Sequence, residues 1–144
     1  MAKAGDVYPV FKNTITIKVA GANNDDALAL FVEEVPAMAG VPMHVHKGAT
    51  ETLFVLKGRY KISVAGKVRE LGEGDGVYLP ADVPHAYTNI DSQRGQLLFT
   101  IYPSGLEGFF EEFSQSGLDP ATQLPDINRI AAKYQLEIVG PPLE

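Results

Sequence analysis

Short apolar segments alternate with glycine-rich turns along most of the chain. In residues 13–21, Ile15, Ile17 and Val19 alternate with polar side chains, which is the two-residue period of a half-buried strand. Similar segments recur at short intervals, and we expect strands at 13–21, 27–35, 41–46, 51–58, 59–66, 67–71, 77–80, 85–90 and 95–103. Strands this short, interrupted by glycine this regularly, predict an all-β sandwich or jelly-roll barrel.

The C-terminal part follows a different period. Residues 105–117 place Phe109, Phe110 and Phe113 at helical spacing, and residues 124–137 show a similar apolar pattern. We therefore expect two short helices in this part of the chain. An aromatic stripe could bind a partner, but more often it covers an exposed end of a barrel, and that is the prediction made here.

The size and composition fit one compact domain. The chain has 144 residues, of which 45% are apolar, and this is enough for a substantial core. We expect a single domain over residues 1–144, with a β-barrel core at about 13–103 and a helical segment at about 105–137.

Charge and residue types argue against several functions. The formal net charge of −6, with scattered Lys and Arg, argues against a nucleic-acid partner, because phosphate binding needs a basic patch. The absence of cysteine excludes disulfides and thiolate metal sites. No apolar run approaches membrane-spanning length, and the N-terminal residues lack a signal-peptide pattern. We expect a cytoplasmic protein with no membrane partner.

Two of the three histidines lie two positions apart. Side chains at i and i+2 of a strand point to the same face, so His44 and His46 project together. Glu51 lies at an odd offset from His46, but the turn-like segment 47–50 can fold the chain back and place Glu51 on the same side. The sequence therefore predicts that two imidazoles and a carboxylate converge within one hairpin.

The third histidine, His85, begins another expected strand far along the chain. A lone histidine is usually a surface or core residue, but the spacing around His85 is regular. Gly74 is followed after five residues by Pro80, after four more by His85 and after three more by Asn89.

Together, these two segments resemble the two sequence motifs of the cupin family. The first motif is matched by Gly40, His44, His46, Glu51 and Gly58, and the second by Gly74, Pro80, His85 and Asn89. Two positions depart from the family pattern, since Gly40 lies closer to His44 and Asp82 stands where a glycine usually follows the proline. Both departures concern loop shape rather than the ligand positions.

The resemblance implies a cupin jelly-roll barrel, a double-stranded β-helix, that binds one metal ion through His44, His46, Glu51 and His85. Imidazole nitrogen combined with carboxylate oxygen suits Fe, Mn, Ni, Co, Cu or Zn. Four protein ligands leave positions open on an octahedral ion for water, O₂ or substrate. The alternatives are a metal that only stabilises the barrel and an empty site, and structural zinc sites more often use cysteine.

The residues around the expected metal site are apolar and aromatic. Tyr87 shares strand parity with His85, and Leu53 and Val55 share it with Glu51, so these three should line the cavity. Tyr78 and Phe99 are further candidates, but the sequence pattern does not determine which way their side chains point. Because no Lys or Arg converges on this region, we expect a small and largely uncharged organic substrate.

Within the cupins, the chain looks most like small single-domain proteins of the quercetin-dioxygenase type. That resemblance implies oxygenase chemistry on an enolic or aromatic substrate, with Glu51 as the catalytic base that takes the proton of a metal-bound substrate hydroxyl. A redox-neutral isomerase or lyase and a non-catalytic small-molecule-binding cupin remain alternatives. Because cupins commonly pair through strand edges and residues 13–21 would leave an open edge, we also expect a homodimer.

Overall fold

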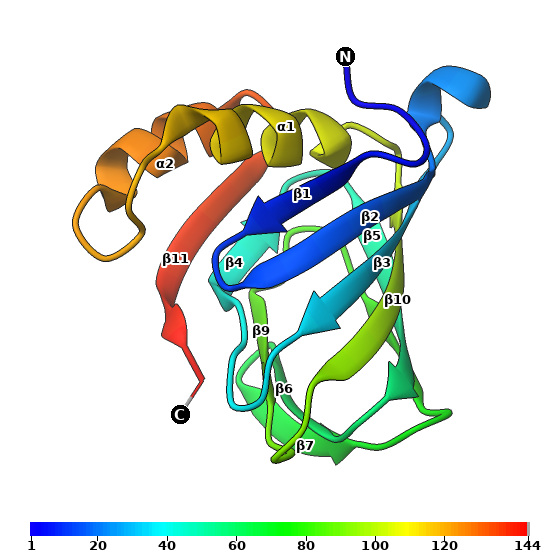
Figure 1. Cartoon of the computed structure of the whole chain (residues 1–144), viewed down its shortest axis with the longest axis vertical. Helices are drawn as coiled ribbons and strands as arrows, with labels where there is room; N and C mark the ends of the chain where they lie inside the picture. Colours follow the sequence, from blue (N-terminus) through cyan, green and yellow to red (C-terminus); the bar gives the residue numbers. More distant parts are fainter. Residues whose placement is uncertain (144) are drawn as a thin grey trace.

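The computed structural model describes residues 1–143 and folds them into two antiparallel sheets packed face to face, as a jelly-roll sandwich (Figure 1). The first sheet contains, in order, β1 (Val7–Val10), β2 (Asn13–Val19), β3 (Ala29–Val35), β10 (Gly95–Tyr102), β5 (Thr50–Lys57) and β8 (Gly76–Leu79). The second contains, in order, β11 (Leu136–Pro142), β4 (Pro42–His46), β9 (His85–Asn89), β6 (Tyr60–Val64) and β7 (Lys67–Leu71). The expected all-β jelly roll is confirmed, but over residues 1–143 the sheets do not close into a barrel.

The core lies between the sheets and follows from the alternation of apolar side chains. In β3, Ala29, Phe31, Glu33 and Val35 are buried, while the residues between them are only half-buried. The strand register places Phe31 opposite Phe99 of β10, and their rings stack with centroids 4.8 Å apart. Full burial of each ring contributes about 1.5–3 kcal/mol to stability. Glu33 is a carboxylate in this otherwise apolar row.

Two helices lie across one end of the sandwich (Figure 1). The first is α1 (Leu106–Ser116), which agrees with the expected helix to within one residue at each end, and the second is α2 (Leu124–Ala132). Phe110 of α1 is buried and packs edge-on against Phe31 of β3, with ring centroids 5.3 Å apart. The aromatic stripe therefore covers an end of the core, as expected. Within residues 1–143, no helix is both long and apolar enough to span a membrane.

The second expected helix is too long, because its last residues belong to a strand. The helix α2 ends at Ala132, and the following segment forms β11. In β11, Leu136 and Ile138 are buried at alternate positions, which is the period of a strand rather than of a helix. β11 pairs with β4 so that Leu136 lies opposite His46 and Ile138 opposite His44. The C-terminal segment thus packs directly against the histidine-bearing strand.

The N-terminal strand β1 has no counterpart among the expected strands, because it is only four residues long and contains Pro9. It pairs with β2, from Val7 opposite Thr16 to Val10 opposite Asn13. The edge of β2 that motivated the expected homodimer is therefore covered by β1.

The homodimer stays a prediction, and one strand edge available for it is that of β1, where Val7 is 55% exposed. Light scattering at micromolar concentration should give twice the mass of one chain, and Val7→Lys should shift the population toward single chains, because charge on an edge strand opposes pairing. A single-chain mass for the wild-type protein would contradict the prediction.

Candidate metal centre

Four side chains from three strands converge between the two sheets. His44 and His46 come from β4, His85 from β9 and Glu51 from β5. His44 lies directly opposite His85 in the second sheet, while β5 belongs to the first sheet. The candidate ligand atoms of all four residues lie within 4.8 Å of one another. The cluster therefore bridges the two sheets, whereas the sequence predicts convergence within a single hairpin.

The loops beside the cluster accommodate both departures from the family motif. The backbone N–H of Gly48, in the turn after β4, donates to the carboxylate of Asp82 at 3.0 Å, and the N–H of Asp82 donates to the carbonyl of His46 at 3.0 Å. Asp82 has a φ of 67°, a left-handed conformation that glycine adopts freely and Asp tolerates. At Gly40, a Cβ would lie 2.2 Å from the carbonyl oxygen of Tyr87, so the close approach requires glycine. Neither departure displaces a ligand.

Backbone carbonyls orient two of the imidazoles. Nδ1 of His44 lies 2.7 Å from the carbonyl oxygen of Pro42, and Nδ1 of His85 lies 3.3 Å from that of Val83. In each contact the Nδ1–H donates to the carbonyl, which leaves the lone pair on Nε2. Such contacts fix the tautomer and the ring orientation of metal-binding histidines.

Burial keeps two of the histidines neutral. Burial, together with the neighbouring His85 and His46, holds the pKa of His44 well below its usual 6.5. Burial and His85 lower the pKa of His46 to about 3. For His85, burial lowers the pKa, but the adjacent carboxylate of Glu51 outweighs it, so the pKa of His85 is raised. His44 and His46 therefore need lose no proton before they bind an ion.

Glu51 and His85 leave two buried polar atoms facing each other. Oε2 of Glu51 lies 3.0 Å from Nε2 of His85 and 3.5 Å from Nε2 of His46. Although the first distance suits an ion pair, neither Oε2 of Glu51 nor Nε2 of His85 has a hydrogen-bond partner. With the proton of His85 on Nδ1, both atoms carry lone pairs, and a cation between them would satisfy both. Three imidazole nitrogens and one carboxylate oxygen fit a divalent transition metal ion.

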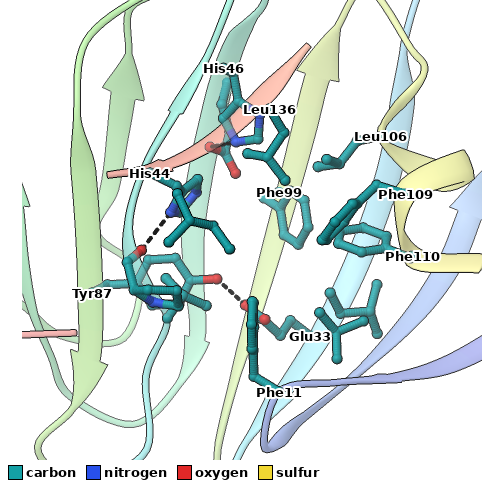
Figure 2. Close-up of a pocket in the computed structure, with 16 residues that line it drawn as sticks. Phe11, Glu33, His44, His46, Tyr87, Phe99, Leu106, Phe109, Phe110 and Leu136 are labelled. Carbon is teal, nitrogen blue, oxygen red and sulfur yellow. Dashed lines mark hydrogen bonds and ion pairs between the residues drawn. The ribbon is translucent and has the colours of Figure 1, made fainter. Parts of the chain in front are cut away.

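An apolar cavity of about 50 Å³ lies beside the cluster (Figure 2). His44, His46 and Glu51 form part of its wall. Much of the remaining wall comes from α1 and from β11, which contribute Leu106, Phe109, Phe110, Leu136 and Ile138. The C-terminal elements therefore form much of the cavity wall, and the ligand side chains border a largely apolar space.

The expected pocket residues divide into two groups. Tyr87 and Phe99 line the cavity. Leu53 and Val55 are buried in the core but do not form its wall. Tyr78 is a correction, because it is 59% exposed and alternates with buried residues along β8, so it points to the outer face of the sheet.

Phe11 and Glu33 are among the residues of the cavity wall that are absent from the set expected from the sequence. Phe11 lies in the turn between β1 and β2, where no sequence pattern indicates its direction. Glu33 could have been found from the sequence, because it lies in phase with the buried apolar side chains at alternate positions of β3.

Glu33 is a buried carboxylate with two hydrogen-bond donors. The hydroxyl of Tyr87 donates to Oε1 (Figure 2). The side-chain amide of Asn13 donates to Oε2 at 3.0 Å. Burial raises the pKa of Glu33 to about 7, although the bonds from Tyr87 and Asn13 act in the opposite direction. The cavity is thus bordered by the candidate metal ligands and, separately, by Glu33, a carboxyl group that can hold a proton near neutral pH.

The raised pKa of Glu33 predicts a pH-dependent stability. The folded-state pKa of Glu33, about 7, lies above its usual value of 4.5, so this contribution to stability is full below about pH 4.5 and is lost as the pH rises through 7. In the metal-free protein, the free energy of unfolding of wild type relative to Glu33→Gln should fall by up to about 3 kcal/mol across this window. Denaturant titrations at several pH values measure it, and a difference that stays constant with pH would contradict the account.

A bound metal ion should stabilise the fold. At a free ion concentration of a hundred times Kd, the gain is about 2.7 kcal/mol. Acid should release the ion, because protons compete for the imidazoles, and the raised pKa of His85 makes it the first to be protonated. The check is the melting temperature at pH 7.5 with and without a chelator, repeated below about pH 6. An unchanged melting temperature at pH 7.5 would mean that the cluster holds no ion.

Comparisons with known proteins agree with this geometry. The chain is 29% identical over 104 residues to the quercetin 2,3-dioxygenase of Bacillus subtilis, a match that covers 72% of this chain and 29% of that protein. It is 29% identical over 69 residues to an uncharacterized protein of Methanocaldococcus jannaschii, covering 48% and 55% of the two chains. It is 25% identical over 60 residues to polyketide synthase CurC of Streptomyces cyaneus, covering 42% and 39%. The matches thus span between 29% and 55% of the length of these relatives.

Solved structures share the fold. A predicted oxalate decarboxylase of Thermotoga maritima gives a TM-score of 0.61 at 16% identity, covering 72% of this chain and 98% of that one. The polyketide cyclase RemF of Streptomyces resistomycificus gives 0.60 at 20% identity, covering 69% and 74%. The family model described as a cupin domain matches residues 31–101, which include all four candidate ligands. The chain belongs to the cupin superfamily.

Proposed function

We propose that this protein is a metal-dependent oxygenase of the quercetin-dioxygenase type, which acts on a small enolic or aromatic substrate and uses one divalent transition metal ion. The observation that carries the proposal is the pair of unsatisfied atoms, Oε2 of Glu51 and Nε2 of His85, in a cluster that borders an apolar cavity. The likeness to a quercetin 2,3-dioxygenase supports the same reaction class.

In the proposed mechanism, each group of the site has a separate task. An ion held by His44, His46, Glu51 and His85 would supply the positive charge that lowers the pKa of a substrate hydroxyl. The carboxylate of Glu51 accepts the proton of that hydroxyl.

The side chains around Glu51 prepare this transfer. The aromatic rings of Phe99, Phe109 and Phe110 exclude water from the reacting atoms. Tyr87 is held by its hydrogen bond to Glu33, so the far wall of the cavity keeps its shape.

A redox-neutral reaction is the second candidate, because two of the similar proteins are described as a polyketide synthase and a polyketide cyclase. The same cluster would then polarise an enolisable substrate without O₂. Oxygen consumption that tracks substrate loss separates the oxygenase from this candidate and from a non-catalytic binding cupin. Turnover of substrate under nitrogen separates the redox-neutral enzyme, which should still react, from the non-catalytic binding cupin, which should not.

Replacing Glu51 tests whether it is only a metal ligand or also the catalytic base. Three histidines can still hold an ion in Glu51→Ala, but the substrate hydroxyl then lacks a proton acceptor, and a positioned base contributes about 10²–10⁴ in rate. We expect Glu51→Ala to keep much of its metal and to lose most quercetin-dependent O₂ consumption, without rescue by added ion. His85→Ala should lose metal and activity together.

The controls measure metal content beside initial rates in each variant. Glu70→Ala, which removes an exposed carboxylate paired with Arg59, should match wild type in both. The base role of Glu51 would be refuted if fully metallated Glu51→Ala turned over at the wild-type rate. The oxygenase proposal would be refuted if the wild-type protein consumed no O₂ with quercetin or related enols.

A further inference from the structure

The cavity beside the candidate metal centre is too small for an aromatic substrate. Its volume is about 50 Å³, whereas a site for one water needs about 10–15 Å³ and pockets for organic ligands measure about 300–1,000 Å³. Three of the four ligand side chains are buried, with Glu51 4% and His85 2% exposed, while His44 is half-buried. A substrate of the proposed class must therefore bind mainly outside this cavity and reach the metal centre through its wall.

A second hollow, which we call the outer groove, lies on the other side of that wall. Its volume is about 790 Å³, within the range of pockets that bind organic molecules. It is bordered by the β1–β2 turn, residues 38–40, the segment between α1 and α2, and the end of β11. The lining is largely apolar and rich in proline, and its charged side chains are one cation, Lys12, and one anion, Asp119. An uncharged organic molecule suits this lining, because burying an unpaired charge there would be costly.

Three residues line both the cavity and the outer groove, namely Phe11, Pro42 and Ile138. Pro42 and Ile138 are held in paired strands, and both the N–H and the carbonyl of Ile138 are hydrogen-bonded to the side chain of Asn128. Pro42 also accepts the hydrogen bond from Nδ1 of His44. These two residues cannot move without disturbing the strand that carries the ligands.

Phe11 is placed differently. It lies in the two-residue turn between β1 and β2, at the outer edge of the first sheet, and its ring packs against Phe113 with centroids 5.2 Å apart. Its φ of 56° lies in the left-handed region, which is rare for a bulky side chain and costs on the order of 1–3 kcal/mol. Figure 2 shows Phe11 at the Glu33 end of the cavity, away from His46. Of the three residues in the shared wall, Phe11 is the one that lies in a turn, outside the paired strands.

We propose that the outer groove binds the body of an uncharged, planar aromatic substrate and that Phe11 is the gate through which its reactive end reaches the metal centre. The proposal rests on the proposed function only for the chemistry at that reactive end. Glu33 and Tyr87, which lie just inside the gate, would be the first polar groups that the entering molecule meets.

The probe for this proposal is 1,10-phenanthroline, a neutral planar aromatic chelator, and the assay uses protein loaded with Zn²⁺. The measured quantity is the rate of zinc transfer to the chelator, followed by absorbance. Phe11→Gly removes the ring and suits the left-handed backbone, so the hairpin should fold. We expect this variant to transfer zinc at least about tenfold faster than wild type, because a closed gate limits the population open to the chelator. Phe11→Leu should lie between the two.

Two further variants test the groove and the specificity of the effect. Ala121→Trp fills the outer groove and should slow transfer to phenanthroline in the Phe11→Gly background, while transfer to the polyanionic chelator EDTA should change little. Phe54→Ala is the matched control, because it truncates a 40% exposed ring outside both hollows, and it should transfer zinc at the wild-type rate.

The outcomes separate this proposal from the proposed function, because the assay involves neither O₂ nor turnover. Equal zinc-transfer rates in wild type and Phe11→Gly, at equal zinc content, would overturn the gate. An unchanged phenanthroline rate on adding Ala121→Trp would overturn the groove as the binding site. A protein that passes both tests but consumes no O₂ would refute the oxygenase alone.

Discussion

The site depends on the contact between Oε2 of Glu51 and Nε2 of His85, which are buried, 3.0 Å apart and without hydrogen-bond partners. A folded protein tolerates such a pair only if something compensates the electrostatic cost of burying it. Here the backbone makes the arrangement persistent, because the carbonyl of Val83 binds Nδ1 of His85 and turns Nε2 inward. A cation is the compensation that fits the four side chains, so the remaining features of the site can be understood from the requirement to hold one.

Much of the site could be predicted from the sequence, because strand parity is a local property. The spacing of His44 and His46 places both side chains on one face, whatever sheet the strand joins. Tyr78 shows the limit of such reasoning, since its direction depends on the pairing of β8 with β5, where it lies opposite Thr52 rather than Glu51. The convergence across the two sheets also escapes a local pattern, because a turn after His46 is compatible with a hairpin and with a crossing between sheets.

The errors at the two ends of the chain have a common cause. Residues 124–137 carry an apolar pattern that suits a helix, but the last of them gain more by pairing with β4 and covering the histidine strand. β1 is short and contains a proline, and it forms because the edge of β2 is available to it. In both segments tertiary pairing overrides the local signal. These two segments, with α1, supply most of what separates the metal centre from the surface, so the shape of the substrate site could not be predicted from the motif residues.

The claim on which the account rests is that the cluster binds one divalent transition metal ion through three imidazoles and one carboxylate. X-ray absorption spectroscopy of protein purified without added metal measures both the element and its nearest neighbours. We expect a first shell of nitrogen and oxygen atoms at about 2.0–2.2 Å, with the outer-shell scattering of imidazole rings. Protein that contains no transition metal, or an ion whose shell shows no imidazole scattering, would contradict it.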